Sequence, residues 1–305
     1  MTNAQVTDKH PGELADVPGW FPPLDQMLFT WFLERQQKQG THGDLLEVGV
    51  YLGKSAILLG HHLRPGETFT VCDLFEGEAP DGANQAEAAK SYSSLTRQAF
   101  ERNYLSFHDT LPTVIAAPSS VVSEKVAPDT CRFVHIDASH LYEHVHGDIG
   151  AAHDILLPDG IVVLDDFRSE HTPGVSVAAW EAVLNRGLRP VCLSTQKLYG
   201  TWGDPEPVQE DLLEMLRQRT DVGLSVQEAA GHRLIRTRSR GMKPPPFPTS
   251  RHYVAPVPAP ARAETAEPRA ARPARPAPSR ARRLAKDLLP PVLTRAVRRV
   301  RASRA

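Results

Sequence analysis

The sequence predicts an α/β fold in which helices flank a mostly parallel sheet. Short apolar runs at residues 44–48, 68–73, 132–137 and 160–165 have the length and composition of strands that are buried on both faces. Stretches with a helical spacing of apolar residues separate these runs. Strands that alternate with helices are typical of a parallel sheet, because parallel neighbours need a long crossover connection.

The other elements follow from local patterns along the chain. Leu24, Met27 and Leu28 share one helical face, so residues 24–33 are predicted to form a helix over the sheet. Residues 75–92 are predicted to contain a loop that closes over the functional edge. The further predicted helices are 55–63, 94–104, a stretch that begins near 141, 175–184 and 206–220; the further strands are 113–117, a hairpin at the sheet edge (190–195 and 197–202), and a last short strand at 232–237.

The stretch Asp44–Ser55, which reads DLLEVGVYLGKS, predicts a strand, a tight turn and the start of a helix. Gly49 and Gly53 permit a sharp turn and a close approach of the backbone to a ligand. The first N–H groups of the following helix have no partner within the helix and face whatever occupies the turn. A nucleotide-like cofactor is the expected occupant.

Two common nucleotide-binding turns do not fit this stretch. A P-loop that ends in Gly53-Lys54-Ser55 requires glycine at position 48, which is Val48. A dinucleotide turn requires glycine at position 51, which is Tyr51. What remains is Glu-x-Gly-x-x-x-Gly-x-Ser, and a glycine-rich turn without a ligand stays open as an alternative.

Two polar positions follow the next strands of the predicted sheet. Asp73 ends the strand at 68–73, where a carboxylate is suited to accept hydrogen bonds from both ribose hydroxyls of a cofactor. Ser119 follows the strand at 113–117, at the place expected for an adenine ring. A helix N-cap for Asp73 and simple turn chemistry for Ser119 are the alternatives.

Acids also follow the strands at 132–137 and 160–165. Asp137, Asp165 and Asp166 are expected to meet at one edge, because the carboxyl ends of parallel strands lie together. Three carboxylates repel one another, and Mg²⁺ or Mn²⁺ would relieve the repulsion. His140, three residues beyond Asp137, is placed to accept a proton near neutral pH. Helix capping by these aspartates is the alternative reading.

The composition, 41% hydrophobic and 23% charged, is that of a globular protein, and no run of 18 apolar residues predicts a membrane span. Cys72, Cys131 and Cys192 are isolated and show neither a disulfide framework nor zinc spacing. Residues 1–19 lack the apolar centre of a secretory signal, so a cytoplasmic location is expected.

The charge is divided unequally along the chain. Residues 251–305 carry 14 basic and 3 acidic residues, a net charge of +11, and the remaining 21 basic and 33 acidic residues leave a net charge of −12. The basic segment at 280–305 has an amphipathic pattern that suits an anionic membrane surface or an acidic partner; a solvated tail is the alternative. Nucleic acid is disfavoured as a partner of this basic segment, since Tyr253 is the only Phe, Tyr or Trp among residues 251–305 that could stack on a base.

Three motifs together resemble one enzyme family. They are Glu47-x-Gly-x-x-x-Gly53-x-Ser55, Asp137-x-x-His140-x-Tyr142 and Asp165-Asp166-Phe167. They look like the metal-dependent class I S-adenosylmethionine (SAM) O-methyltransferases that include the macrocin and mycinamicin enzymes, with the cephalosporin-pathway methyltransferases close by. The resemblance covers about residues 17–200. It implies a Rossmann-like, doubly wound, mostly parallel sheet of seven strands with helices on both faces.

The resemblance also implies a site and a domain plan. SAM would be bound by Glu47, Gly49, Gly53, Ser55, Asp73, Ser119 and Asp137; Asp137, Asp165 and Asp166 would hold Mg²⁺ or Mn²⁺; and His140 would be the base for a sugar hydroxyl. The expected plan is a flexible N-terminus (1–17), a SAM-dependent methyltransferase domain (18–240), a disordered linker rich in Pro, Ala and Arg (241–279) and the basic tail (280–305).

The expected function is therefore O-methylation of a sugar or a glycosylated metabolite, with a small-molecule or glycan acceptor as partner. Methyl transfer to a hydroxyl needs an aligned oxygen and removal of its proton, and a bound metal supplies both alignment and acidity. Methylation of a catechol-like phenol by the same site is one alternative. A catalytically silent fold that serves as a binding or scaffold module is another. A homo-oligomer and a peripheral association with membranes are compatible with the sequence.

Overall fold

The computed structural model describes residues 9–77, 82, 85 and 95–255. The chain divides into two units, residues 1–255 and 256–305, and the described fold belongs to the first. The predicted basic tail, most of the predicted linker and most of the predicted loop at 75–92 lie outside the described residues.

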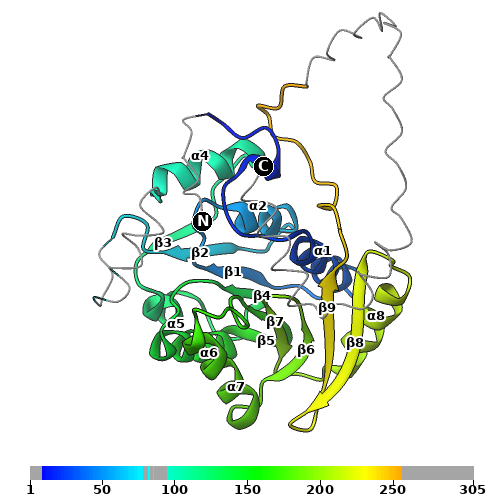
Figure 1. The fold of residues 1–305 in the computed structure, drawn as a ribbon. Coiled ribbons are helices and arrows are strands. Elements are labelled where there is room, and N and C mark those ends of the chain that lie inside the picture. The colour runs from blue at the N-terminus through cyan, green and yellow to red at the C-terminus, as the bar shows by residue number, and fades with distance from the viewer. Residues whose placement is uncertain (1–8, 78–81, 83–84, 86–94, 256–305) are drawn as a thin grey trace, which may run out of the picture. The chain divides into compact units, whose positions relative to one another are not determined.

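One sheet of nine strands runs through the fold in the order β3-β2-β1-β4-β5-β7-β6-β9-β8 (Figure 1). Strands β3, β2, β1, β4 and β5 are parallel, β7 is antiparallel to both of its neighbours, β9 is parallel to β6, and β8 is antiparallel to β9. The strands are β1 Asp44–Val48, β2 Phe69–Asp73, β3 Thr113–Ala116, β4 Cys131–Ile136, β5 Leu156–Leu164, β6 Arg189–Leu193, β7 Leu198–Thr201, β8 Val222–Ala229 and β9 His232–Ser239. The predicted α/β class with a mostly parallel sheet is confirmed.

The prediction of seven strands was wrong, because the hairpin of β8 and β9 extends the sheet past β6. A tight turn joins the two strands, with φ of 52° at Ala230 and 76° at Gly231. Five of the eight residues of β8, from Ser225 to Ala229, are exposed. Val222, Leu224 and Val226 nevertheless alternate with small or polar residues, a strand signal that the prediction did not use. The predicted hairpin of β6 and β7 is present, but β7 lies inside the sheet, between β5 and β6, rather than at the edge.

Helices cover both faces of the sheet, as predicted (Figure 1). One apolar core joins α1, α2, α4 and α8 to the sheet, and a second core joins α5, α6 and α7 to the opposite face. Among the described residues, no helix has both the length and the apolar character needed to cross a membrane. The helices are α1 Pro23–Lys38, α2 Lys54–His61, α4 Arg97–Phe107, α5 Val122–Lys125, α6 Tyr142–Ile155, α7 Pro173–Asn185 and α8 Glu206–Arg217, with short 3₁₀ turns at Leu14–Asp16 and Ser119–Val121.

Segments at both ends of the first unit pack against each other. Leu14 and Val17, in the stretch assigned to the flexible N-terminus, are buried. Ser250, in the stretch assigned to the linker, donates from its hydroxyl to the carbonyl of Pro11 and from its backbone N–H to that of Gly12. These contacts attach residues 9–17 and 241–255 to the domain.

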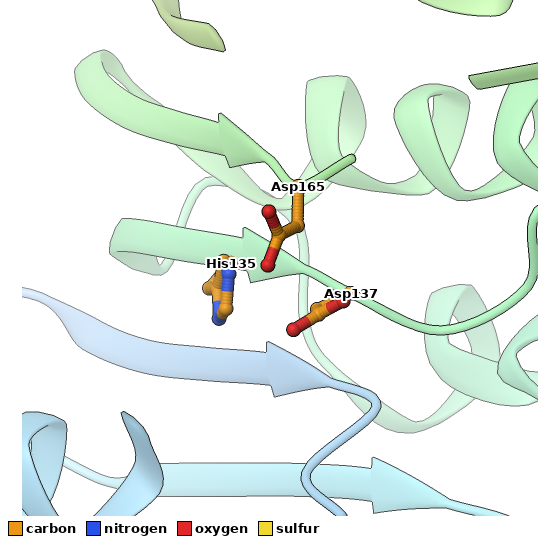
Figure 2. Close-up of side chains that lie close together, drawn as sticks. All are labelled: His135, Asp137 and Asp165. Carbon is orange, nitrogen blue, oxygen red and sulfur yellow. The ribbon is translucent and has the colours of Figure 1, made fainter. Parts of the chain in front are cut away.

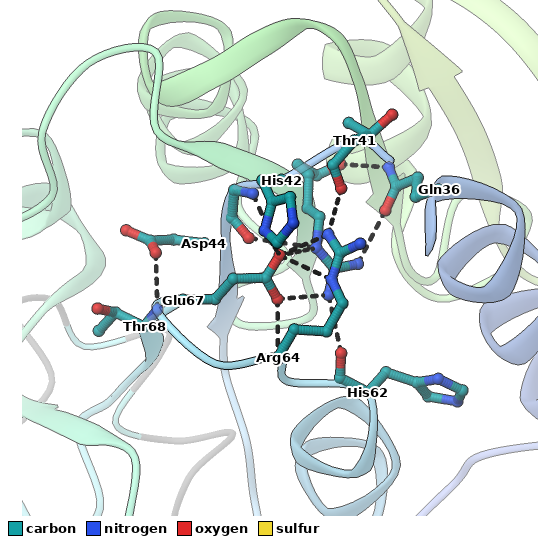
Figure 3. A network of polar contacts seen from close by, with 10 residues as sticks. Gln36, Thr41, His42, Asp44, His62, Arg64, Glu67 and Thr68 are labelled. Carbon is teal, nitrogen blue, oxygen red and sulfur yellow. Dashed lines mark hydrogen bonds and ion pairs between the residues drawn. The ribbon is translucent and has the colours of Figure 1, made fainter. Parts of the chain in front are cut away.

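A buried ion-pair network ties the amino ends of β1 and β4 to the loop before β2 (Figure 3). The side chain of Arg132 is 1% exposed and that of Glu67 is 2% exposed. Arg132 donates to both carboxylate oxygens of Glu67, at 3.0 and 2.9 Å, and to Oε1 of Gln36 at 3.0 Å. Arg64 also pairs with Glu67. Because Arg132 is buried, its charge depends on Glu67 for compensation.

The variant Glu67→Gln is expected to lose about 3–5 kcal/mol of unfolding free energy, since it leaves the Arg132 guanidinium buried without a counter-charge. Glu210→Gln, which breaks the exposed pair with Arg233, is the control and should lose less than about 1 kcal/mol. Urea unfolding at pH 7 measures both. Equal losses would show that the Arg132 network contributes no more than a surface pair.

The same network predicts how stability depends on pH. Although burial alone would raise the pKa of Glu67, hydrogen bonds from Arg132 and Arg64 lower it from the ordinary 4.5 to about 2. A pKa that is lower in the folded state gives stability that is present above pH 4.5 and is lost as the pH falls towards 2. Unfolding followed between pH 6 and pH 2 should therefore show a smaller acid-induced loss in Glu67→Gln than in the wild type.

Candidate active site

The chain turns sharply between β1 and α2. Gly49 and Gly53 have φ of 81° and 91°, in the left-handed region that favours glycine. A Cβ atom on Gly49 would lie 2.0 Å from the carbonyl oxygen of Asp137, whereas one on Gly53 would lie 3.0 Å from the ring of Phe100. Glycine at position 49 is therefore needed for the close packing of this turn against the loop that follows β4.

Asp73, the last residue of β2, is held by backbone N–H groups. Its Oδ2 accepts from Val50 at 2.8 Å and from Tyr51 at 3.1 Å, and its Oδ1 accepts from Phe75 at 2.8 Å. Burial raises the pKa of Asp73, and these hydrogen bonds oppose the rise. The carboxylate thus fixes the glycine turn. Each oxygen has two lone pairs, so contacts with ribose hydroxyls stay compatible with this arrangement.

Glu47 and Ser55, two of the predicted cofactor residues, are engaged with each other inside the domain. Glu47 is fully buried, and its Oε1 lies 2.7 Å from Nδ1 of His135. Burial raises the pKa of Glu47 to about 8, although the hydrogen bond with Ser55 opposes the rise. The Glu47 side chain is therefore mostly protonated at neutral pH and serves as an internal partner of His135.

Ser119 lies in the 3₁₀ turn after β3, and its side chain hydrogen-bonds to Asp148 of α6. Burial raises the pKa of Asp148 to about 6, and the bond with Ser119 opposes this. The contact links the β3 turn to α6. The predicted role of Ser119 beside an adenine ring stays a prediction.

Carboxylates from two strand ends meet beyond β4 and β5, where the parallel topology predicts them. Figure 2 shows Asp137 just past the end of β4 and Asp165 just past the end of β5. The two side chains share a hydrogen bond. Burial and the charge of Asp165 raise the pKa of Asp137 well above its ordinary value, whereas Lys197 overcomes burial and lowers that of Asp165. Asp137 is therefore the proton donor of this pair.

Asp166 faces His140, the predicted base. Its Oδ2 lies 3.1 Å from Nε2 of His140, and its Oδ1 accepts from the hydroxyl of Ser169. Although burial alone would raise it, these contacts bring the pKa of Asp166 to about 2. Asp166 also has a φ of 51°, which is uncommon for a residue other than glycine. The hydroxyl of Thr172 bonds to the Asp166 carbonyl at 2.9 Å and supports this conformation.

The predicted metal and catalytic residues line one small cavity. Asp137, His140, Asp165 and Asp166 surround a volume of ≈ 10 Å³, together with apolar side chains from β4, β5, α6 and α7. That volume is about what one water molecule or one ion needs. The structure thus brings together the four side chains to which the sequence assigned metal binding and proton transfer.

Lys197 belongs to the same cluster, although no sequence pattern pointed to it. Its side chain is 1% exposed, and its Nζ donates to Oδ2 of Asp165 and, at 3.1 Å, to Nε2 of His135. The pKa of Lys197 is raised, because the nearby carboxylates outweigh its burial. Lys197 directly precedes β7, and because β7 is antiparallel to β5 it starts at the edge of the sheet where β5 ends.

His135 is a second candidate ligand, since it offers an atom within 4.8 Å of oxygens of Asp137 and Asp165 (Figure 2). However, its Nδ1 contacts Glu47 and its Nε2 contacts Lys197. Burial and the charge of Lys197 lower the pKa of His135 well below its ordinary value, so the ring is neutral. Both ring nitrogens of His135 are thus engaged. Among the described residues, the candidate ligand atoms that lie within 4.8 Å of one another belong to His135, Asp137 and Asp165, so Asp166 as a third metal ligand stays a prediction.

A family profile described as "Methyltransferase domain" matches residues 46–167. This range runs from β1 to the loop after β5 and contains the glycine turn, Asp73 and the carboxylate cavity. Residues 46–167 are therefore similar to a methyltransferase domain. The match agrees with the methyltransferase character predicted from the motifs, and the sheet order agrees with the Rossmann-like fold that the resemblance implied.

No curated protein matches the sequence. The solved O-methyltransferase NovP is 20% identical, with a TM-score of 0.46 over 59% of this chain and 81% of that one. CalS11, a TDP-rhamnose 3'-O-methyltransferase of calicheamicin biosynthesis, is 17% identical, with a TM-score of 0.41 over 60% and 82% of the two chains. The MycE methyltransferase of the mycinamycin pathway, in complex with Mg, SAH and mycinamycin VI, is 14% identical, with a TM-score of 0.39 over 62% and 52%. Likenesses of this size carry no argument about the acceptor or the metal of this methyltransferase domain.

The packing of the glycine turn predicts a difference between two glycine variants. Gly40 has a φ of +71° and open space around the Cβ position, whereas Gly49 has a φ of +81° and faces the Asp137 carbonyl. Gly40→Ala should cost about 1–2 kcal/mol for its left-handed backbone. Gly49→Ala should cost roughly 1–3 kcal/mol more or prevent folding, because its methyl group has no room. Thermal unfolding compares them, and similar melting temperatures would refute a packing requirement at Gly49.

Proposed function

We propose that this protein is a SAM-dependent, divalent-metal-assisted O-methyltransferase that acts on a hydroxyl of a sugar or a glycosylated metabolite. The observation that carries the proposal is the carboxylate cavity with the His140–Asp166 contact at its wall, in a methyltransferase domain. A cavity of this kind holds a cation and a base side by side, which is what proton removal from a hydroxyl requires.

SAM is assigned to the edge formed by the glycine turn, Asp73 and Asp137. When bound, it supplies the electrophilic methyl group. The turn supports this assignment, because Asp73 clamps the backbone of Val50 and Tyr51 and so presets its shape. A preset turn loses little conformational entropy when a ligand arrives.

The donor set of the cavity fits Mg²⁺ or Mn²⁺. Asp137, Asp165 and Asp166 offer carboxylate oxygens, the ligands that these ions prefer, around a space of the size of one ion. Asp137 carries a raised pKa in the metal-free protein, so a cation there would take the place of its proton. Such an ion would align the acceptor oxygen and lower its pKa.

His140 is assigned to accept the acceptor's proton. With Nε2 donating to Asp166, the basic lone pair of the neutral ring lies on Nδ1. Asp166 holds the ring in this tautomer and stabilises the imidazolium that forms. In this assignment the hydroxyl proton would pass to Nδ1 of His140 as the oxygen bonds to the methyl carbon, and the bond from that carbon to the sulfonium sulfur would break, so that SAM would leave as SAH.

Removal of the base or its partner should separate cofactor binding from turnover. His140→Ala and Asp166→Ala are each expected to reduce methyl transfer by at least about 10²-fold and to keep the SAM affinity of the wild type within about threefold. Calorimetry with SAM gives the affinity, and transfer of a labelled methyl group to a panel of sugar nucleotides, glycosides and catechols gives turnover. His153→Ala, at an exposed histidine paired with Asp154, is the control and should match the wild type.

The outcomes of this experiment separate the alternatives. Full turnover in both variants would refute the proposed mechanism. Methylation of catechols alone would favour the phenol alternative over a sugar. Failure of the wild type to bind SAM, with or without Mg²⁺, would favour a silent methyltransferase fold that acts as a binding module.

The basic tail supports a separate proposal from its sequence alone, a peripheral contact with anionic membranes. Residues 251–305 carry a net charge of +11, and each basic residue near an anionic surface contributes about 1 kcal/mol of attraction. A chain that ends at residue 255 should keep its turnover with soluble acceptors and should sediment less with phosphatidylserine vesicles at low salt. Equal sedimentation of the two forms would exclude the tail as the membrane contact.

A further inference from the structure

Lys197 reaches the carboxylate site from the sheet side rather than from the cavity. Strand β7 runs antiparallel to β5 with Leu198 opposite Leu164, so the residue before β7 lies beside the residue after β5. The turn at 194–197 holds it there, since the Lys197 N–H donates to Oγ of Ser194 at 3.0 Å. The residues that line the cavity do not include Lys197. Its ammonium therefore contacts Asp165 without filling the space beside it.

The groups around this ammonium come from four elements. Asp165 follows β5, His135 and Asp137 belong to β4 and its loop, Asp25 lies on α1, and Glu47 lies on β1. Burial of an ammonium is strongly unfavourable unless an anion compensates it. Asp165 supplies that anion through a direct hydrogen bond. The pair therefore compensates the charge of the buried ammonium.

This pair sets the charge that a cation in the cavity would meet. Asp137, Asp165 and Asp166 bring carboxylates to the cavity, and the Lys197 ammonium places one positive charge beside them. Lys197 also occupies one oxygen of Asp165, while the other accepts from the Asp166 N–H at 2.7 Å. The ammonium therefore competes with a cation for Asp165 and repels it across a short, buried distance.

We propose that Lys197 is a positioning residue of the candidate cation site, which acts through Asp165: it holds this carboxylate in place and keeps divalent binding weak and exchangeable. This inference rests on the proposed metal-assisted function. It assigns the tuning of the site to a residue outside the cavity, directly before a strand that lies beyond the residues that the methyltransferase profile matches.

Removal of the ammonium tests the proposal, because the expected effect is opposite to that of structural damage. Lys197→Met in the full chain should bind Mn²⁺ about tenfold or more tightly than the wild type, since the repulsion is gone and Asp165 is released. Lys197→Arg, which restores the charge, should return the Mn²⁺ affinity to within about threefold of the wild type. Lys125→Met, at the end of α5 and outside the cluster, is the matched control and should leave it unchanged. Titration calorimetry measures Mn²⁺ and SAM binding for all four proteins.

Unchanged or weaker Mn²⁺ binding by Lys197→Met, in a protein that still binds SAM as the wild type does, would overturn the role of Lys197 and leave the proposed function intact. Absence of Mn²⁺ binding in the wild type and in Lys197→Met, with SAM binding preserved, would overturn the cation site and this inference together. Absence of SAM binding in the wild type would refute the proposed function itself. If Lys197→Met does not fold, Lys197→Gln, which keeps a hydrogen-bond donor without the charge, must meet the same test.

Discussion

The arrangement of the site depends on one geometric constraint, the direction of the strands. Five neighbouring parallel strands end at the same edge of the sheet, so residues far apart in sequence come together after each strand. Asp73, Asp137 and Asp165 are three such residues. Strand β7 obeys the same constraint in reverse: because it is antiparallel, its first residues, not its last, reach this edge. Strand direction thereby brings the Lys197 ammonium and several carboxylates together from separate segments of the chain.

This convergence buries several ionisable side chains inside the domain. Helix α1 covers them and supplies some of their contacts. Side chains alternate along a strand, so Glu47, His135 and Lys197 all point to the face that α1 covers. Asp25 of α1 accepts a hydrogen bond from the hydroxyl of Tyr199 at 2.7 Å, and Phe29 packs edge-on against the His135 ring at 5.0 Å. The helix excludes water from the cluster, and charges interact more strongly when water is excluded.

The sequence predicted the polar residues that follow the ends of parallel strands. It did not predict contacts between side chains from distant segments of the chain. Asp137, Asp165, Asp166 and His140 stand directly after apolar runs, so their meeting at one cavity was predictable. Lys197 was not, because a lone lysine beside a hairpin turn looks like an ordinary surface residue.

Two further features were missed. β8 was not predicted, although Val222, Leu224 and Val226 alternate with small or polar residues as they do in a strand. The pairing of Arg132 with Glu67 joins residues 65 positions apart, and no local pattern marks such a pair. Glu47 shows a subtler gap: its place in the strand β1 was predicted, whereas its burial against His135 depends on the neighbouring strand.

The contact between Gly49 and the Asp137 carbonyl has a mechanical consequence. A Cβ atom at position 49 would sit 2.0 Å from that oxygen, so the two turns already touch and neither has slack toward the other. Asp73 stiffens one of them through two backbone hydrogen bonds. If the glycine turn moves towards Asp137, the loop after β4 must therefore move with it, and a movement of that loop towards Gly49 displaces the turn. The close contact thus couples the position of the glycine turn to that of the loop after β4.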